Sequence, residues 1–488
     1  MEDIKLIPGI PEEGRYLLRL LKDISLDPAL IIKELPRAIY HFRDSITEEN
    51  RPACLGILET LLGCFELPIP DEPVVKALEK LLEPMSWNDL KHFGIEAYLA
   101  TGLQNPSAEV QLFCFKLVRR ANWKDRDISE NIFELILICL NSESIQVSEE
   151  AFQLLLDMSD YHAYFEQILR EFTDMDYQIL DTTLKVRWLM LFTKLAIKSP
   201  EYMDEVVKKG IFAFDIQETS DIFLRLCYVD VLNLMLETQF SFTYVLTSEY
   251  GLLDQIIRCF VKETSSFTDH IGLTFLPLLC QKHPDAFRTI DEKYDLFNIT
   301  RKRIDTKDTT SVILYGRFLA NETITSLLVQ KYEAESSEQY IPHSLLSRFL
   351  VDDTGLTSLA MALEQPNTSL WSKLWRSLPS GSLSSVIKNA SSPLRRTRQL
   401  GFQCLLHIAQ RSPIQLASQT FAIKYLIATE GDHETCILRY KVLQALWESS
   451  NEGKDLPLGR YQEEVQKRLQ QGAFGGSSST LKVAAKTA

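Results

Sequence analysis

The amino-acid sequence predicts an all-α protein, a curved HEAT/armadillo-like helical-repeat solenoid that ends in a disordered C-terminal tail. Three observations predict this architecture. Apolar residues recur at helical spacing in almost every segment. The chain of 488 residues is far longer than one compact core usually grows. Similar segments return about every 40 residues along part of the chain, which is the period of stacked two-helix repeats.

Turn chemistry favours helices over strands. The 19 glycines and 19 prolines are too few for the many tight turns of a β-sandwich or propeller. Residues that cap and open helices stand at Asp27-Pro28, Asn105-Pro106-Ser107, Ser199-Pro200 and Ser412-Pro413. We therefore expect helices to begin at these four places and to be joined by short turns.

The long-range repeat is clearest in four consecutive segments, which align at Gln111, Ser148, Arg187 and Arg225. Each of these positions follows the one before it by about 40 residues. A later pair of similar helices aligns at Arg398 and Arg439, again with a step of about 40 residues. One two-helix unit cannot bury its apolar face alone, so we expect neighbouring units to stack into a continuous core.

These patterns divide the chain into four regions. Residues 1–300 form an N-terminal helical-repeat array, residues 301–392 irregular repeats with polar insertions, and residues 393–473 C-terminal helical repeats. Residues 474–488 form the tail, whose Gly-Ser run cannot bury enough apolar surface to fold.

Three stretches of the middle region predict irregular structure. The basic cluster at residues 301–303 is followed by acidic residues, which indicates a solvated loop. Residues 333–344 are polar and predict a loop between repeats. Residues 377–392 are rich in Ser, which predicts a turn or a flexible break.

Polar residues form stripes on one side of several predicted helices, and in a HEAT-like unit the second helix lines the concave face. The stripes also fit the solvated side of ordinary amphipathic helices, so both interpretations stay open. The candidate protein-binding residues of a concave groove are Glu109, Lys116, Arg187, Lys194, Asp221, Arg225, Gln399, Gln403, Lys441 and Gln444.

The sequence contains no pattern typical of catalysis. The nucleotide-binding patterns GxGxxG and GxxxxGK[ST] and the hydrolase pattern GxSxG do not occur. The eight histidines never form HxxxH, and the nine cysteines never form CxxC. Cys404 and His407 lie in an apolar helical run, where packing is the expected role. We expect no enzyme activity, no cofactor, no bound metal and no small-molecule substrate.

The net charge and the sequence contexts of the cysteines limit the cellular compartment and the kinds of partner that we expect. The formal net charge of −14 argues against binding to a nucleic-acid backbone. Residues 1–11 have acidic residues where a secretory signal would be basic, and no apolar run is long enough to span a membrane. The cysteines lie in apolar helical runs, which is typical of reduced thiols in the cytoplasm or nucleus.

Several elements near the C-terminus follow one another in a particular order and spacing: residues 400–410, 421–426, 439–446 and 465–469, and the ending Gln471-Gly472-Ala473-Phe474. Together they resemble the 26S proteasome non-ATPase regulatory subunit 5 family of base-assembly chaperones. The resemblance covers about a quarter of the chain, and the remainder agrees only in length, helical character and repeat period.

This resemblance implies a chaperone that helps assemble the regulatory-particle base. It implies binding to the C-terminal domain of one proteasomal AAA-ATPase subunit and departure before the particle matures. The alternative is a general armadillo- or HEAT-type scaffold or adaptor for another protein. An enzyme would need a polar pocket of converging titratable groups, for which the sequence gives no signal.

Overall fold

The computed structural model describes residues 9–23, 28–64, 71–125, 128–175, 179–335, 339–428, 430–450 and 456–474. Within these ranges the chain is helical and contains no β-strand. The predicted all-α class is therefore confirmed. The predicted tail, apart from Phe474, lies outside the described residues.

The chain divides into two compact units, Met1–Ala213 and Phe214–Ala488. The helices of unit 1 are α1 (Glu12–Asp23), α2 (Pro28–Ser45), α3 (Arg51–Cys54), α4 (Leu58–Gly63), α5 (Asp71–Leu82), α6 (Trp87–His92), α7 (Ile95–Leu103), α8 (Ala108–Val118), α9 (Glu130–Cys139), α10 (Ile145–Met158), α11 (His162–Asp174), α12 (Thr182–Ala196) and α13 (Pro200–Lys208).

Unit 2 contains π-helical turns at Ile271–Phe275 and Gln330–Glu335. Its α-helices are α14 (Ile222–Met235), α15 (Gln239–Thr247), α16 (Leu252–Lys262), α17 (Ser266–His270), α18 (Leu276–Lys282), α19 (Pro284–Tyr294), α20 (Leu296–Asp305), α21 (Thr309–Ala320), α22 (Glu322–Val329), α23 (His343–Arg348), α24 (Asp353–Ala362), α25 (Thr368–Ser377), α26 (Ser382–Ala390), α27 (Arg395–Arg411), α28 (Pro413–Ser418), α29 (Thr420–Ile427), α30 (His433–Glu448) and α31 (Gln462–Gln471).

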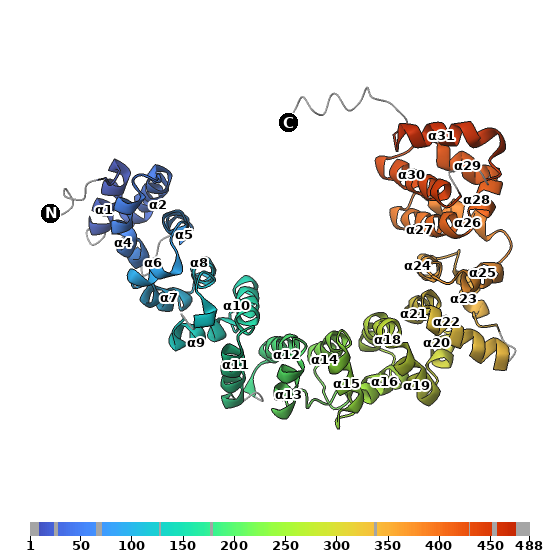
Figure 1. The fold of residues 1–488 in the computed structure, drawn as a ribbon, viewed down its shortest axis with the longest axis horizontal. Helices are drawn as coiled ribbons and strands as arrows, with labels where there is room; N and C mark the ends of the chain where they lie inside the picture. Colours follow the sequence, from blue (N-terminus) through green and yellow to red (C-terminus); the bar gives the residue numbers. More distant parts are fainter. Residues whose placement is uncertain are drawn as a thin grey trace. The chain divides into compact units, whose positions relative to one another are not determined.

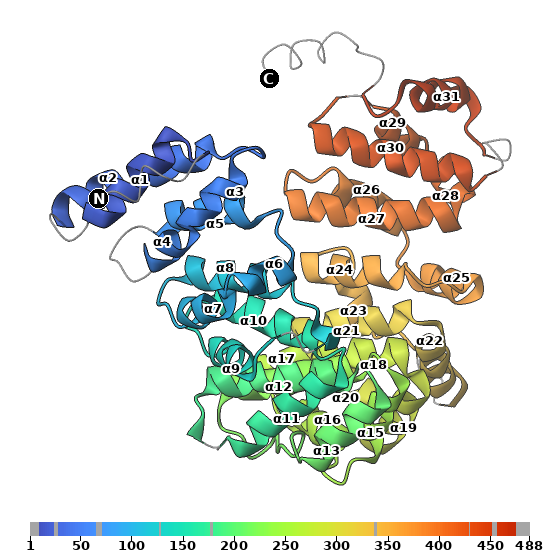
Figure 2. The same cartoon turned by 60° about the vertical axis from the view of Figure 1, so that its left-hand side comes forward.

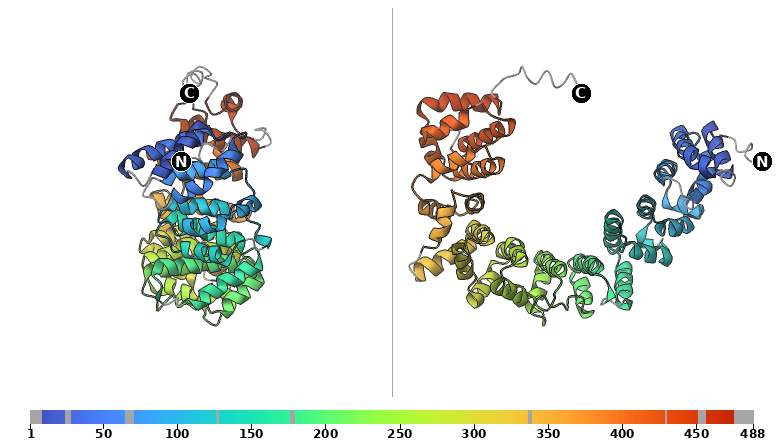
Figure 3. Two further views of the ribbon diagram at one scale, coloured as in Figure 1. Left: turned by 90° about the vertical axis from the view of Figure 1, so that its left-hand side faces the viewer. Right: turned by 180° about the vertical axis from the view of Figure 1, so that it is seen from behind.

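Each unit is built from two rows of helices. One row, called here the B row, consists of α2, α5, α8, α10 and α12 in unit 1, and of α14, α17–α18, α21, α24, α27 and α30 in unit 2. Successive members of the B row pack against each other within each unit. Figure 1 shows this row beside the remaining helices, called the A row, and the views in Figures 2 and 3 show the same two layers. The apolar core lies between the rows and between successive repeats.

The predicted repeat and the predicted helix starts agree with the structure. Four successive B-row helices begin at Ala108, Ile145, Thr182 and Ile222, so that each start follows the previous one by about 40 residues. The four helices with Pro-marked starts, α2, α8, α13 and α28, begin within one residue of the proline or of the Ser that follows it. In α13 the Ser199 hydroxyl accepts a hydrogen bond from the Tyr202 amide at 3.2 Å. The predicted repeat period is confirmed.

A ladder of polar side chains joins the C-terminal ends of successive B-row helices. Each donor follows a B-row helix by a few residues and binds a carbonyl at the end of the preceding one. The pairs are Arg120 to Leu82, Lys198 to Leu156, His283 to Leu236, Asn321 to Cys280 and Gln365 to Leu319. Helix C-termini leave carbonyl groups without intrahelical donors, and the ladder supplies donors from the next repeat. Because each helix end meets the end of the preceding helix, neighbouring B-row helices run parallel.

The basic cluster that was expected in a loop lies in helix α20 instead. Arg301 stacks 3.9 Å from the Tyr332 ring centroid, and Arg303 donates to the carbonyl oxygens of Phe260 and Glu263. Long arginine side chains bury their stems while their heads find acceptors, so a basic run can be part of a packed helix.

The turn predicted in the Ser-rich stretch is present at residues 380 and 381, and helix α26 follows it within the same stretch. The predicted region boundary at residue 300 falls inside α20, whereas the division into two compact units falls between residues 213 and 214. The predicted polar insertion holds a π-helical turn up to Glu335 and the buried residues Tyr340 and Ile341. Residues 336–338 of that insertion lie outside the described ranges.

All nine cysteines are buried, and they carry free thiols. Their burial agrees with the packing role expected from their apolar sequence contexts. Among the described residues, no single helix has both the length and the apolar character needed to cross a bilayer. Only α21 together with Glu322–Glu333 reaches that length and composition, and this pair is bent by 101°.

Candidate protein-binding groove

Half of the predicted binding residues are exposed on B-row helices. Glu109 and Lys116 lie on α8, Gln403 on α27, and Lys441 and Gln444 on α30. Lys116 is already paired with Glu79 of the neighbouring helix α5, and Gln444 donates to Glu448 on its own helix. These five residues therefore form solvated polar surface that is available for contact.

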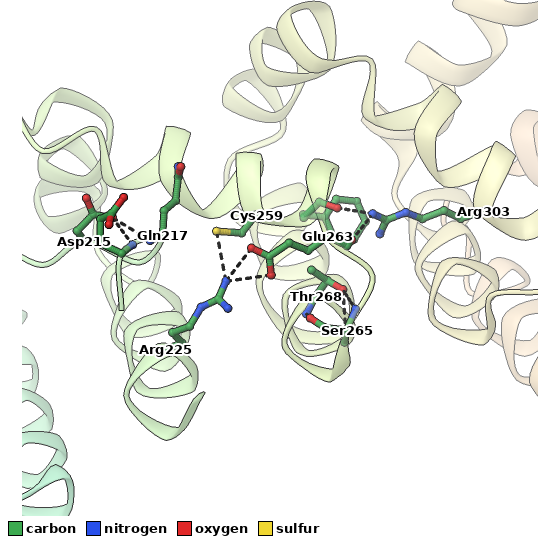
Figure 4. A network of polar contacts seen from close by, with 10 residues as sticks. Asp215, Gln217, Arg225, Cys259, Glu263, Ser265, Thr268 and Arg303 are labelled. Atoms are coloured by element: carbon green, nitrogen blue, oxygen red, sulfur yellow. Dashed lines mark hydrogen bonds and ion pairs between the residues drawn. The ribbon is translucent and has the colours of Figure 1, made fainter. Parts of the chain in front are cut away.

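The two predicted arginines serve the repeat structure itself. Arg187 of α12 donates to the carbonyls of Leu140 and Ser142 at 2.8 and 2.9 Å, after the end of helix α9. Arg225 of α14, with a side chain only 15% exposed, donates to both carboxylate oxygens of Glu263 at 3.1 Å (Figure 4). Its guanidinium also lies 4.0 Å from the Phe267 ring centroid. Reversing either charge would therefore destabilise the fold.

The other predicted residues have similar local roles. Asp221 caps α14 by accepting hydrogen bonds from the amides of Phe223 and Leu224. Gln399 of α27 donates to Glu434 of α30. Lys194 of α12 differs, because its ammonium lies 5.1 Å from the ring centroid of Phe152 on α10 and it lines an open groove.

This groove, called here the α10–α12 groove, has a volume of about 460 Å³ and lies between two B-row helices of unit 1. Its apolar lining consists of Ile145 and Phe152 from α10 and Val186 and Met190 from α12. Ile145 is 67% exposed, and the other three side chains are half-buried. The four side chains thus bring apolar groups from two neighbouring B-row helices to one open groove.

The two walls of the groove have opposite charge. Glu149 is the charged lining residue of α10, whereas Arg187 and Lys194 are the charged lining residues of α12. On the far side of α10, Arg119 of α8 binds Glu150 and Asp157 at 2.8 and 2.5 Å. Burial opposes the charge of Arg119, but these hydrogen bonds raise its pKa above the usual value. Glu149 faces the groove and is exposed.

Sequence reasoning missed the apolar part of this groove. It identified Arg187 and Lys194, which line the groove, but included none of the four apolar lining residues among the candidates. One signal was present. Val147, Ala151, Leu154 and Leu155 define the buried face of α10. Ile145 is two residues before Val147, which places it on the opposite side of the helix, although it is apolar.

Unit 2 has a larger concavity, of about 820 Å³, on its A row between α15, α16 and α19. Its apolar floor includes Phe242 and Ile257, which are buried. At its rim Lys293 binds Asp254 at 2.7 Å, and Lys282 binds Glu237 at 3.0 Å. These rim charges already stabilise each other, so the α10–α12 groove is the stronger candidate for a partner.

The titratable residues of the apolar run in α27 are packed into the helix layers. Burial raises the pKa of Cys404 to about 12 and lowers the pKa of His407 below its ordinary value. Both effects keep the groups neutral, as expected for packed side chains. Among the described residues, no group of three or more His, Cys, Asp or Glu side chains is arranged to hold a metal ion.

Sequence comparison with known proteins identifies a family for this chain, and structural comparison identifies solved proteins of similar fold. No protein-family model matches the chain. Over 489 aligned residues the chain is 53% identical to "Uncharacterized protein C18.17c" of Schizosaccharomyces pombe, and the alignment covers 100% of both chains. The chain belongs to the family of this protein.

Structural similarity extends to karyopherins. A crystal structure of importin β matches with a TM-score of 0.58 and 12% identity, and the match covers 99% of this chain and 69% of that chain. Kap121p bound to Nup53p matches with a TM-score of 0.50 and 13% identity. The match covers 97% of this chain and 51% of Kap121p, so this chain spans about half the length of that protein. At this identity the similarity concerns the fold alone, and it confirms the predicted HEAT-repeat solenoid architecture of this chain.

Proposed function

We propose that this protein is a non-enzymatic scaffold that binds a protein partner on the B row of unit 1. The observation that carries this proposal is the open apolar strip of the α10–α12 groove. Full burial of an apolar side chain contributes about 1.5–3 kcal/mol, so four partly exposed side chains offer a substantial anchor for a partner. The charged walls then provide specificity.

The repeat structure favours this role because it holds the groove in place before binding. Lys198, just after α12, donates to the Leu156 carbonyl and to the Ser159 hydroxyl at the end of α10. Arg119 joins α10 to α8. A preformed surface lowers the entropy that binding must spend on ordering the site.

For the partner, we propose the C-terminal domain of an AAA-ATPase subunit of the proteasome base, and hence a role as an assembly chaperone in the cytoplasm or nucleus. This finer proposal is supported by the resemblance of the C-terminal segments, which form α27, α29, α30 and α31. Gly401 in this region is required by packing, since a Cβ there would lie 2.4 Å from the Ala390 amide nitrogen of α26. The groove supports a protein partner in general, so a scaffold for another protein is the alternative.

The groove is tested by affinity purification of the full-length protein followed by quantitative mass spectrometry. Ile145→Asp places a charge on the apolar strip and should reduce recovery of the main partner at least ten-fold. Ile414→Asp is the matched control, because Ile414 is 58% exposed on α28 and does not line the groove. Equal recovery of the partner by the two variants would remove the α10–α12 groove from the proposal.

The same purification tests the partner. We expect a proteasomal ATPase subunit in the recovered material and no mature 26S particle. Recovery of an unrelated protein whose binding depends on Ile145 would support a general scaffold and contradict the chaperone role. A principal association with mature particles would also contradict it.

A further inference from the structure

We infer that the α10–α12 groove binds an amphipathic helix of the partner, and that the charges of its two walls set the direction of that helix. This inference rests on the proposed function and adds the chemistry and the orientation of the occupant. Its evidence is the composition of the groove walls, the length of the groove and the parallel course of α10 and α12.

A helix fits the groove better than an extended segment because of backbone hydrogen bonding. The backbone groups of α10 and α12 are bonded within their own helices, so they offer few partners to a bound chain. An extended segment buried there would leave N–H and C=O groups without partners, which opposes its binding. A bound helix satisfies its own backbone and needs only side-chain contacts.

The spacing of the lining residues supports the same occupant. On α10 the lining runs from Ile145 to Gln153, and on α12 from Val186 to Lys194. Each run covers eight helical steps, or about 12 Å at 1.5 Å per residue. That length accommodates two turns of a third helix whose apolar residues recur three and four positions apart.

Charged residues of opposite sign line the two sides of the groove. Glu149 lies midway along the α10 lining, and Lys194 lies at the far end of the α12 lining, in the last turn of that helix. Arg187, the other cation of the lining, is bound to the carbonyls of Leu140 and Ser142. The two helices run parallel, since the side chain of Lys198 after α12 reaches the end of α10. A bound helix therefore meets a carboxylate along one flank and an ammonium along the other.

This arrangement distinguishes the two directions in which a helix can lie in the groove. When the bound helix is turned end for end with its apolar face still in the groove, the flank that faced α10 comes to face α12. A helix with basic residues on the flank near Glu149 and acidic residues on the flank near Lys194 therefore makes attractive contacts in one direction. In the other direction its basic flank faces Lys194 and its acidic flank faces Glu149, and both contacts are repulsive. Arg187 is held by the Leu140 and Ser142 carbonyls, so exchanging the charges of Glu149 and Lys194 should reverse the preferred direction without abolishing binding.

The test measures binding of synthetic 16-residue helices by fluorescence anisotropy with the full-length protein. The main probe has a Leu stripe, a row of Glu on one flank and a row of Lys on the other. A second probe has the same sequence except for one central proline, which disrupts the helix. The probe with the intact helix should bind at least ten-fold more tightly to the wild-type protein. Equal binding of the two probes, or no binding of the helical one, would overturn the helical occupant.

Charge exchange tests the direction. Glu149→Lys alone and Lys194→Glu alone should each weaken binding of the helical probe about five-fold, because one exposed ion pair contributes up to about 1 kcal/mol. The double variant Glu149→Lys with Lys194→Glu should bind within about two-fold of the wild-type protein. Binding of the double variant as weak as the product of the two single effects would overturn the claim about direction.

These outcomes are separable from those of the proposed function. Loss of the natural partner on Ile145→Asp together with failure of the helical probe would keep the scaffold and remove the helical occupant. If the helical probe binds the wild-type protein but Ile145→Asp recovers as much natural partner as the wild type, the groove binds a helix but is not the site of the proposed function.

Discussion

The B rows of the two units share a repeat geometry but differ between α10 and α12. Polar side chains bridge α5, α8 and α10 in unit 1, where Lys116 binds Glu79 and Arg119 binds Glu150, and they also bridge successive B-row helices of unit 2. His270 meets Asp230 at 2.9 Å, Thr310 donates to Asp269 at 2.7 Å, and Thr397 donates to Asp353 at 2.7 Å. In unit 1, α10 and α12 leave an apolar groove between them. The helix arrangement thus specifies a continuous row, and a few side chains decide whether that row is internally bonded or open to a partner.

Close helix packing accompanies the bonded row. In α21, Gly316 lies so near α24 that a Cβ atom would come within 2.5 Å of the Ser358 hydroxyl oxygen and 2.6 Å of its carbonyl oxygen. The Ser358 hydroxyl itself donates to the Val312 carbonyl at 2.7 Å. Unit 2 therefore depends on small residues where these helices meet, whereas the α10–α12 groove is lined by Phe, Met, Val and Ile.

Among the variants that test this difference between the units, Gly316→Ala should change the stability most. The added methyl group would have to separate α21 from α24, so we expect a loss of about 3 kcal/mol of unfolding free energy. Differential scanning calorimetry of the full chain would detect it as a lower melting temperature. Gly63→Ala is the matched control, because Gly63 is also helical and a Cβ atom there would meet no other atom within 4 Å. Equal melting temperatures for the two variants would contradict the close contact.

The sequence was sufficient for the repeat but not for the assignment of polar faces. Capping residues and the repeat period identified helix starts correctly, because these signals act within a few residues. The roles of Arg187 and Arg225 were not predictable, since a helical stripe does not reveal whether a long side chain meets solvent or an acceptor in a neighbouring repeat. The groove was missed for the converse reason. Val186 and Met190 are apolar, and only the packing of α10 against α12 determines that they remain half-exposed.

The carbonyl ladder should account for the next largest effect. Gln365 is 1% exposed, and its amide donates to the Leu319 carbonyl at 2.8 Å and to the Thr325 hydroxyl at 3.0 Å. Gln365→Leu leaves the carbonyl without this donor and should cost about 2 kcal/mol. Urea unfolding would show a lower midpoint with an unchanged slope. Gln410→Leu, at an exposed position of α27, should change the midpoint little, and equal losses in both variants would contradict the ladder's contribution.

Converting the open groove into a polar surface like that of unit 2 tests the comparison directly. Met190→Gln preserves side-chain length but removes apolar surface, so partner binding should weaken by about 1 kcal/mol, or roughly five-fold. Gln403→Met makes the opposite change at an exposed position of α27 and should leave binding unchanged. The dissociation constant of the purified partner, measured by calorimetry, is the readout. If Gln403→Met changed the affinity and Met190→Gln did not, the partner would bind α27 of unit 2 and not the α10–α12 groove.

The smallest expected effect is a difference in acid sensitivity. Burial in α27 lowers the pKa of His407 below its usual value, Arg411 also lowers it, and Glu364 opposes the shift. The unfolded chain therefore binds a proton as the pH falls through about 6.5, while the folded chain does not yet bind one. Stability that is present above that pH is progressively lost below it. His407→Gln should reduce the fall in melting temperature between pH 7.5 and pH 5.5. His162→Gln, at an exposed site of unit 1, should leave the fall as large as in the wild-type chain, and an equal reduction in both variants would contradict a specific contribution from the His407 ring.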